Sequence, residues 1–489
     1  MKPDARLTKG PIGRTLLVFA LPVLGSNILQ SLNGSINSVW VGRFLGEAAL
    51  TATSNANIVL FFLLGVVFGI SMASTIMVGQ ALGARDVPEA RRVAGTGITF
   101  FVALSVAAAA GGYVFTPRIL AGMHTPPDAA PLAVTYLRII FVALPFMYFF
   151  SFVMMTLRGA GDSRTPFWFM LLSALLDVGL NPLLIFGAGP VPRLGIAGSA
   201  LATLTAQLVS LVAMIVLLYR RKHFLLPHRG DLGMLRPDPA ILKALVLKGL
   251  PMGLQMVVIS SSAIAMMSLV NRYGSQTSAA YGVASQLWTY VQMPALAVGA
   301  SVSSMVAQNV GAGLWGRVRR ITRAGLLFNV VMTGALVGLI YLFDRHSLSL
   351  FLGEDGTAIG IAQHINAVVL WSFILFGFTI VLFGTVRATG AVMAPLVILF
   401  LSMWLVRLPF AYSMSTPLGA EALWWSFPLG STVSLVLALG YYRLGRWRRA
   451  HILPAAPRPL APDTSMGTPC EDAGEPGAEP VVAPVAASR

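Results

Sequence analysis

Residues 78–92 read Val-Gly-Gln-Ala-Leu-Gly-Ala-Arg-Asp-Val-Pro-Glu-Ala-Arg-Arg, and a version of this stretch returns late in the chain. The second version, Val-Ala-Gln-Asn-Val-Gly-Ala, occupies residues 306–312 and is again followed by arginines. Other landmarks recur at almost the same offset, which predicts two copies of one unit. The matched pairs are Gln80 with Gln308, Pro22 with Pro251, Arg158 with Arg387, and Pro166 with Pro395.

The composition predicts a membrane protein. Of 489 residues, 56% are hydrophobic and only 11% are charged, and the mean hydropathy is +0.77. A soluble domain carries roughly 25% charged residues. Apolar runs about 20 residues long recur, which is the length of a helix that spans a bilayer. A β-barrel would show short alternating segments instead. The fold class predicted is therefore an all-α integral membrane protein.

About twelve spans are expected, six in each of two pseudo-symmetric bundles. They lie near residues 15–41, 50–81, 92–114, 131–153, 166–187, 195–219, 244–270, 279–310, 319–343, 359–384, 394–414 and 420–442. The corresponding domains are an N-terminus at 1–14, an N-lobe at 15–219, a linker at 220–243, a C-lobe at 244–443 and a tail at 444–489. The tail is rich in Pro, Ala and Gly, so we expect it to be disordered.

The net charge of +16 comes from basic loops, not from a nucleic-acid-binding surface, so no nucleic-acid partner is predicted. With twelve spans, the basic segments fall on one side, which the positive-inside rule makes cytoplasmic. Both termini are then expected inside, in a bacterial inner membrane. These segments contain Lys2, Arg6, Lys9, Arg14, Arg85, Arg91, Arg92, Arg220, Arg221, Lys222, Arg317, Arg319, Arg320, Arg323, Arg443, Arg446, Arg448 and Arg449. The single cysteine, Cys470, excludes a disulfide framework.

The first span is unusually polar. Gln30, Asn33 and Asn37 recur at helical spacing and share one face. Lipid does not tolerate such a face, so it either packs on another helix, as small polar residues often do, or lines a wet cavity. Two amides and a glutamine on one stripe favour the cavity.

An acid lies inside the fifth span. Asp177 follows an uncharged run from Pro166 to Leu176, and Asn181 lies one turn later on the same face. An ionisable group at membrane depth is costly and usually marks an ion or proton pathway. We therefore predict Asp177 as the ion-coupling residue and Asn181 as a cavity residue, against the alternative of a structural aspartate.

Three further positions are candidates for function. Asn57 and Gln286 are related by the offset of the repeat, stand in matching spans and are predicted to line the cavity. Pro22 can bend the first span, either as a gating hinge or as a static kink. Arg407 lies deep in a late span, and it can also cap carbonyls freed by Pro409.

Signatures of catalysis are absent from the sequence. It contains no phosphate-binding loop for ATP, no His-Glu-x-x-His pair and no nucleophile elbow. We therefore predict no enzymatic activity, no catalytic residues, no metal site and no cofactor other than a coupling proton or sodium ion.

Several motifs in order resemble the MATE (multidrug and toxic compound extrusion) transporters over residues 10–445, and the lack of an acid near Ile259 is similar to the DinF-like branch. The motifs are Leu21-Pro22, Val-Gly-Arg-Phe-Leu-Gly at 41–46, Gln-x-x-Gly-Ala at Gln80 and Gln308, Arg-Gly-Ala-Gly-Asp at 158–162, and Asn-Pro-Leu-Leu-Ile-Phe-Gly at 181–187.

The resemblance implies two six-helix bundles that open alternately to each side. It also implies export of small organic compounds, cationic or amphipathic, by antiport with protons or sodium, with the protein expected to act as a monomer among membrane lipids. Family members usually carry an aspartate where this chain has Asn37. In the fifth span they carry asparagine and then aspartate, whereas this chain has Asp177 and then Asn181.

Other functions fit these residues less well. A lipid-linked oligosaccharide flippase tends to have more cavity charge and extra spans, and export of an endogenous metabolite is a further alternative. An intramembrane enzyme needs a convergent catalytic set that one deep aspartate does not supply. A channel would need a filter-like repeat.

Overall fold

The computed structural model describes residues 6–187, 192–226, 232–349, 357–450 and 452. All regular secondary structure in these residues is helical. The first half holds α1 (Ile12–Leu45), α2 (Glu47–Gly83), α3 (Val87–Gly122), α4 (Ala130–Gly159), α5 (Arg164–Phe186) and α6 (Ile196–Arg220). The second half holds α7 (Pro239–Val270), α8 (Ser275–Val291), α9 (Met293–Gly311), α10 (Trp315–Leu342), α11 (Asp344–Ser349), α12 (Thr357–Val369), α13 (Ser372–Arg387), α14 (Met393–Phe400), α15 (Leu408–Ser413), α16 (Ser415–Leu418) and α17 (Glu421–Leu444). A π-helix, η4 (Leu401–Arg407), joins α14 to α15, and short 3-10 helices cover Arg6–Thr8, Leu232–Leu235, Asn271–Tyr273 and Arg446–Arg449.

The described residues contain eleven helices long and apolar enough to span a membrane, or twelve if one bent pair is a single span. That pair is α12 with α13, and it bends by 45°. The prediction of an all-α membrane fold with about twelve spans is confirmed. The two copies differ in regularity, because α8 and α9 together match the unbroken α2, and α14, η4 and α15 together match α5.

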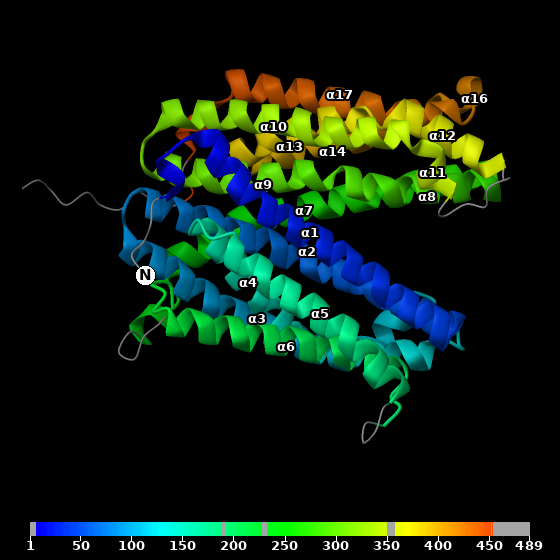
Figure 1. Cartoon of the computed structure of the whole chain (residues 1–489), viewed down its shortest axis with the longest axis horizontal. Coiled ribbons are helices and arrows are strands. Elements are labelled where there is room, and N and C mark those ends of the chain that lie inside the picture. The colour runs from blue at the N-terminus through cyan, green and yellow to red at the C-terminus, as the bar shows by residue number, and fades with distance from the viewer. Residues whose placement is uncertain (1–5, 188–191, 227–231, 350–356, 451, 453–489) are drawn as a thin grey trace, which may run out of the picture. The chain divides into compact units, whose positions relative to one another are not determined.

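The two halves pack against each other along α2. In Figure 1, α2 lies beside α7 and α9, with α3, α4 and α6 to one side and α10, α13 and α17 to the other. Glycines permit this close approach. A Cβ added at Gly69 would lie 2.3 Å from the backbone nitrogen of Gly253, and one added at Gly83 would lie 1.9 Å from the Gln308 carbonyl oxygen. Residues Met1–Leu453, which include both halves, form one compact unit.

The second end of the predicted linker differs from expectation. Helix α6 runs to Arg220, and α7 begins at Pro239, not near 244. Asp238 caps α7 by accepting hydrogen bonds from the backbone nitrogens of Ala240 at 2.9 Å and Ile241 at 3.3 Å. Proline at the first helical position and aspartate at the cap are a strong start signal, so the linker is shorter than the apolar pattern predicted.

The beginning of the predicted disordered tail is ordered. Residues Arg446–Arg449 form a 3-10 helix, and the Trp447 side chain is 1% exposed. Its indole nitrogen donates to the Tyr442 carbonyl at 2.8 Å, and its ring stacks on that of Tyr442. Residues 451 and 453–489 of the tail, with Cys470, lie outside the described residues, as do residues 1–5 and 227–231 of the predicted N-terminus and linker.

Candidate functional site

Asp177 is the centre of a polar cluster within the first half. It lies on α5, and its side chain is enclosed, with 2% of its surface exposed. The Thr203 hydroxyl on α6 donates to its Oδ1 at 3.0 Å. Asn33 on α1 contributes a second side-chain hydrogen bond. Three helices therefore converge on one carboxyl group.

Asn37 extends this cluster along α1. Its Oδ1 accepts a hydrogen bond of 2.8 Å from the Ser199 hydroxyl on α6. Its side chain also hydrogen-bonds the hydroxyl of Tyr136 on α4. Ser199 and Thr203 are four residues apart, so they present both hydroxyls on one face of α6.

Two amide oxygens in the cluster lack a partner. Asn181 donates from Nδ2 to the Asp177 carbonyl at 2.9 Å. The enclosed Oδ1 of Asn181 has no hydrogen-bond partner. The enclosed Oδ1 of Asn33 is also unpaired. A buried polar atom without a hydrogen bond is costly. Two acceptors beside a carboxylate suit a hydrated proton or a sodium ion, because hard cations prefer oxygen ligands.

The other predicted cavity residues do not join this cluster. Gln30, Asn57 and Gln286 have exposed side chains. Pro22 lies inside α1, which continues as one helix through it, and its carbonyl accepts from the Ser26 hydroxyl at 2.9 Å.

The sequence reasoning missed Thr203, Ser199 and Tyr136. Serine and threonine at i and i+4 in an apolar span were a usable signal for the first two. Nothing in the sequence placed Tyr136 next to Asn37, because that contact depends on how α4 packs.

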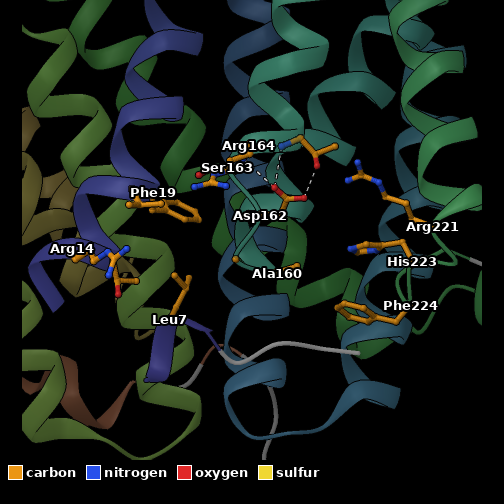
Figure 2. A pocket seen from close by; sticks show the side chains of 14 residues that line it. Leu7, Arg14, Phe19, Ala160, Asp162, Ser163, Arg164, Arg221, His223 and Phe224 are labelled. Carbon is orange, nitrogen blue, oxygen red and sulfur yellow. Dashed lines mark hydrogen bonds between the residues drawn. The ribbon is translucent and has the colours of Figure 1, made fainter. Parts of the chain in front are cut away.

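A separate cavity of about 480 Å³ lies near the start of α1, lined by basic groups on three segments. Figure 2 shows Arg14 on α1, Arg164 at the start of α5, and Arg221 with His223 after α6. Asp162 accepts from the Thr165 hydroxyl at 2.6 Å and from two backbone nitrogens. Burial lowers the pKa of His223 to about 4, although the nearby Asp162 charge opposes this.

The residues that the structure describes contain no cluster of three or more His, Cys, Asp or Glu side chains that could hold a metal ion. In the cluster around Asp177, the polar groups are one carboxylate together with hydroxyl and amide groups.

The model of the MatE family matches residues 22–183 and again residues 251–413. The chain belongs to the MATE family. The "Probable multidrug resistance protein YoeA" of Bacillus subtilis is 38% identical over 91% of this chain and 96% of its own length. The "FAD transporter" of Shewanella oneidensis is 26% identical over 91% of this chain and 97% of its own length.

The same fold occurs in a solved structure described as the "outward-facing conformation of a multidrug resistance MATE family transporter of the MOP superfamily". It aligns with a TM-score of 0.83 and 20% identity, and the match covers 91% of this chain and 97% of that one. MATE proteins are transporters and not enzymes, so this chain is a multi-pass membrane transporter of the multidrug-efflux family. The family predicted from the sequence motifs is confirmed.

Proposed function

We propose that this MATE protein exports organic compounds, cationic or amphipathic, by antiport with protons or sodium ions. The observation behind the proposal is the enclosure of Asp177 within a spanning helix, held by Thr203 and Asn33. A carboxyl group so placed can exchange its charge for a bound cation or proton, and intramembrane acids usually do so.

Binding of the coupling ion would act on α1 through Asn33. Neutralising Asp177 weakens the charge-assisted hydrogen bonds that it accepts, and this frees α1 to shift against α5. Asn37 and Asn181 orient the cluster, and Pro22 supplies the bend. Gln30, Asn57 and Gln286, exposed as they are, line the path of the substrate between the lobes.

We place the protein in a bacterial inner membrane with both termini cytoplasmic, because the basic loops lie on that side. The N-lobe at 15–219 and the C-lobe at 244–443 open alternately, and the protein works as a monomer in lipid. Membership of the DinF-like branch remains a prediction.

The test is efflux of a fluorescent cationic dye from proteoliposomes, under a proton gradient and separately under a sodium gradient. We expect one gradient to drive efflux and Asp177→Asn to abolish it at normal protein levels. Asp344→Asn is the matched control, because Asp344 also accepts an amide hydrogen bond, from Asn366 at 2.8 Å, but lies outside the cluster. Equal efflux by Asp177→Asn and wild type would show that Asp177 is structural.

A second candidate function is export of an endogenous metabolite, which is supported by the relative named as an FAD transporter. Efflux of FAD from loaded proteoliposomes, without efflux of the dye, would favour it. A lipid-linked oligosaccharide flippase is the remaining alternative, and it would be indicated if neither compound moved.

A further inference from the structure

The π-helix η4 brings one residue of the second half into the place that Asp177 holds in the first. Pro166 is the third residue of α5, and Pro395 is the third residue of α14. Arg407 lies one residue further from Pro395 than Asp177 lies from Pro166. A π-turn accommodates one residue more than an α-turn, so η4 absorbs this difference.

The family match supports the same insertion. Its first stretch covers residues 22–183 and its second covers residues 251–413, so the second is longer by one residue. The two stretches end at residues 183 and 413, which are 230 positions apart. Asp177 and Arg407 are separated by the same 230 positions. Arg407 is therefore the positional counterpart of that acid. The N-lobe thus carries an enclosed acid where the C-lobe carries an enclosed base.

Arg407 is enclosed but has no acid beside it. The residue is 9% exposed, and its Nε has no hydrogen-bond partner. Its guanidinium carbon lies 3.5 Å from the centroid of the Phe427 ring, and its stem packs against Gly430 on α17. Within the described parts of the chain, no carboxylate forms a salt bridge with it. Nor does it donate to a carbonyl near Pro409 among these residues, so the capping role considered from the sequence is not supported.

Other aromatic rings pack around the Phe427 ring that covers this cation. The Phe427 ring lies edge-on to that of Trp288, at 5.0 Å between centroids. The Tyr281 ring stacks on that of Trp424 at 5.9 Å between centroids and lies 6.3 Å from that of Phe427. A guanidinium stays protonated in proteins, and an enclosed charge without a counter-charge is costly. An anion would relieve that cost, and the half-buried Phe427 ring would contact an apolar body attached to it.

We propose that Arg407 and the Phe427 ring beside it form a binding site in the C-lobe for an organic anion, namely a carboxylate, sulfonate or phosphate joined to an aromatic body. This inference rests on the proposed function, because it names the substrate class for an exporter of organic compounds. It assigns amphipathic anions, among the compounds of that class, to a site in the C-lobe.

The test compares two dyes that share a xanthene ring system but differ in charge. Fluorescein is anionic at neutral pH, and rhodamine 123 is cationic. Binding is measured by fluorescence anisotropy with the full chain in nanodiscs of phosphatidylcholine, with no ion gradient. We expect wild type to bind fluorescein, and Arg407→Gln to weaken that binding by about 30-fold or more, as expected for loss of one partner of an enclosed charge pair.

Two more variants make the result decisive. Arg272→Gln is the matched control, because Arg272 also stacks on a ring of the same half, that of Tyr412, at 5.9 Å; it should bind fluorescein as wild type does. Arg407→Lys keeps the charge but loses the planar guanidinium, so its affinity for fluorescein should lie between those of wild type and Arg407→Gln. If Arg407→Gln does not fold, weaker fluorescein binding by Arg407→Lys than by wild type tests the proposal instead.

Equal fluorescein binding by wild type and Arg407→Gln would overturn the inference, as would absence of fluorescein binding by the wild type. Displacement of fluorescein by phosphatidylglycerol in the nanodisc would assign the site to a lipid headgroup and would also overturn it. Asp177→Asn should bind fluorescein normally. Failure of the coupling proposal therefore appears in the efflux assay, and failure of this inference appears in the binding assay.

Discussion

At the scale of single residues, the cluster around Asp177 is defined by short polar contacts between helices. Its hydroxyl and amide donors replace the water that a carboxylate loses on burial. The resemblance implies an acid in the first span where this chain has Asn37, and this Asn37 is bound by Ser199 and Tyr136. On the proposed function, Asp177 alone would carry the ionisable role that the resemblance implies for two positions.

Removing the Thr203 hydroxyl should impair coupling. Thr203→Val deletes the 3.0 Å donor to Asp177 while keeping the shape of the side chain. A hydrogen bond to a charged group contributes about 1.5–3 kcal/mol, so we expect gradient-driven efflux to fall at least severalfold. Thr203→Ser retains the hydroxyl and should preserve most of the efflux. Similar loss in both variants would mean that packing, not the hydroxyl, matters.

His223 should make stability depend on pH. Its folded pKa of about 4 lies below the unfolded value of 6.5. The unfolded chain therefore gains a proton first, and the free energy of unfolding falls as pH drops from about 6.5 to about 4, by at most about 3 kcal/mol. When the pH is lowered from 7.5 to 5, the thermal unfolding midpoint should decrease less in His223→Gln than in wild type. An identical loss in both would contradict this assignment.

At the scale of helices, backbone contact between the halves depends on glycine. Helices α2 and α9 meet where Gly83 faces the Gln308 carbonyl and Gly311 faces the Gln80 carbonyl, and an added Cβ would lie 1.9 Å from the oxygen in both cases. The repeated Gln-x-x-Gly-Ala motif is thus the sequence of a helix crossing. The motif occurs once in each half because each helix needs a glycine where it meets the glutamine carbonyl of the other.

Alanine at this crossing should destabilise the protein. Helix propensity alone would favour Gly→Ala by about 1 kcal/mol. At Gly83 we expect the clash to prevail and to cost about 1–3 kcal/mol, which should lower the thermal midpoint in detergent. Gly338→Ala in α10 is the control, because no atom lies within 4 Å of its added Cβ, and its midpoint should stay equal or rise. A raised midpoint for Gly83→Ala would show that the helices separate freely.

At the scale of the whole molecule, the two halves hold each other by a pair of reciprocal hydrogen bonds. Gln80 donates from Nε2 to the carbonyl of Ala388, the C-cap of α13, at 2.7 Å. Gln308 donates from Nε2 to the Gly159 carbonyl at the end of α4 at 3.0 Å. Because Gly159 and Ala388 are themselves repeat partners, the halves exchange the same contact. The pair closes one end of the seam, the end that the proposed orientation makes cytoplasmic.

Breaking both contacts should favour opening at this end. In Gln80→Ala/Gln308→Ala, two hydrogen bonds of about 1 kcal/mol each are lost and two carbonyls are left unpaired. We expect faster hydrogen exchange of residues 306–312, measured by mass spectrometry in nanodiscs. Gln286→Ala removes an exposed glutamine in the same half and should leave the exchange unchanged. Unchanged exchange in the double variant would indicate that apolar packing alone keeps the seam closed.

The sequence by itself determined the repeat, the membrane environment, the family and the place of an acid, Asp177, within a span. Those properties depend on composition, on span length and on local spacing, which are all readable along the chain. It could not reveal that Tyr136 and Ser199 bind Asn37, because packing of separate helices decides contacts between residues far apart in sequence.

Only the tertiary structure decided the place of Arg407. The offset that relates Pro166 to Pro395 pairs Arg407 with Val178, and the π-helix alone moves it into register with Asp177. Sequence spacing assumes one helical period, whereas the backbone can absorb an extra residue where neighbouring helices stabilise the wider turn.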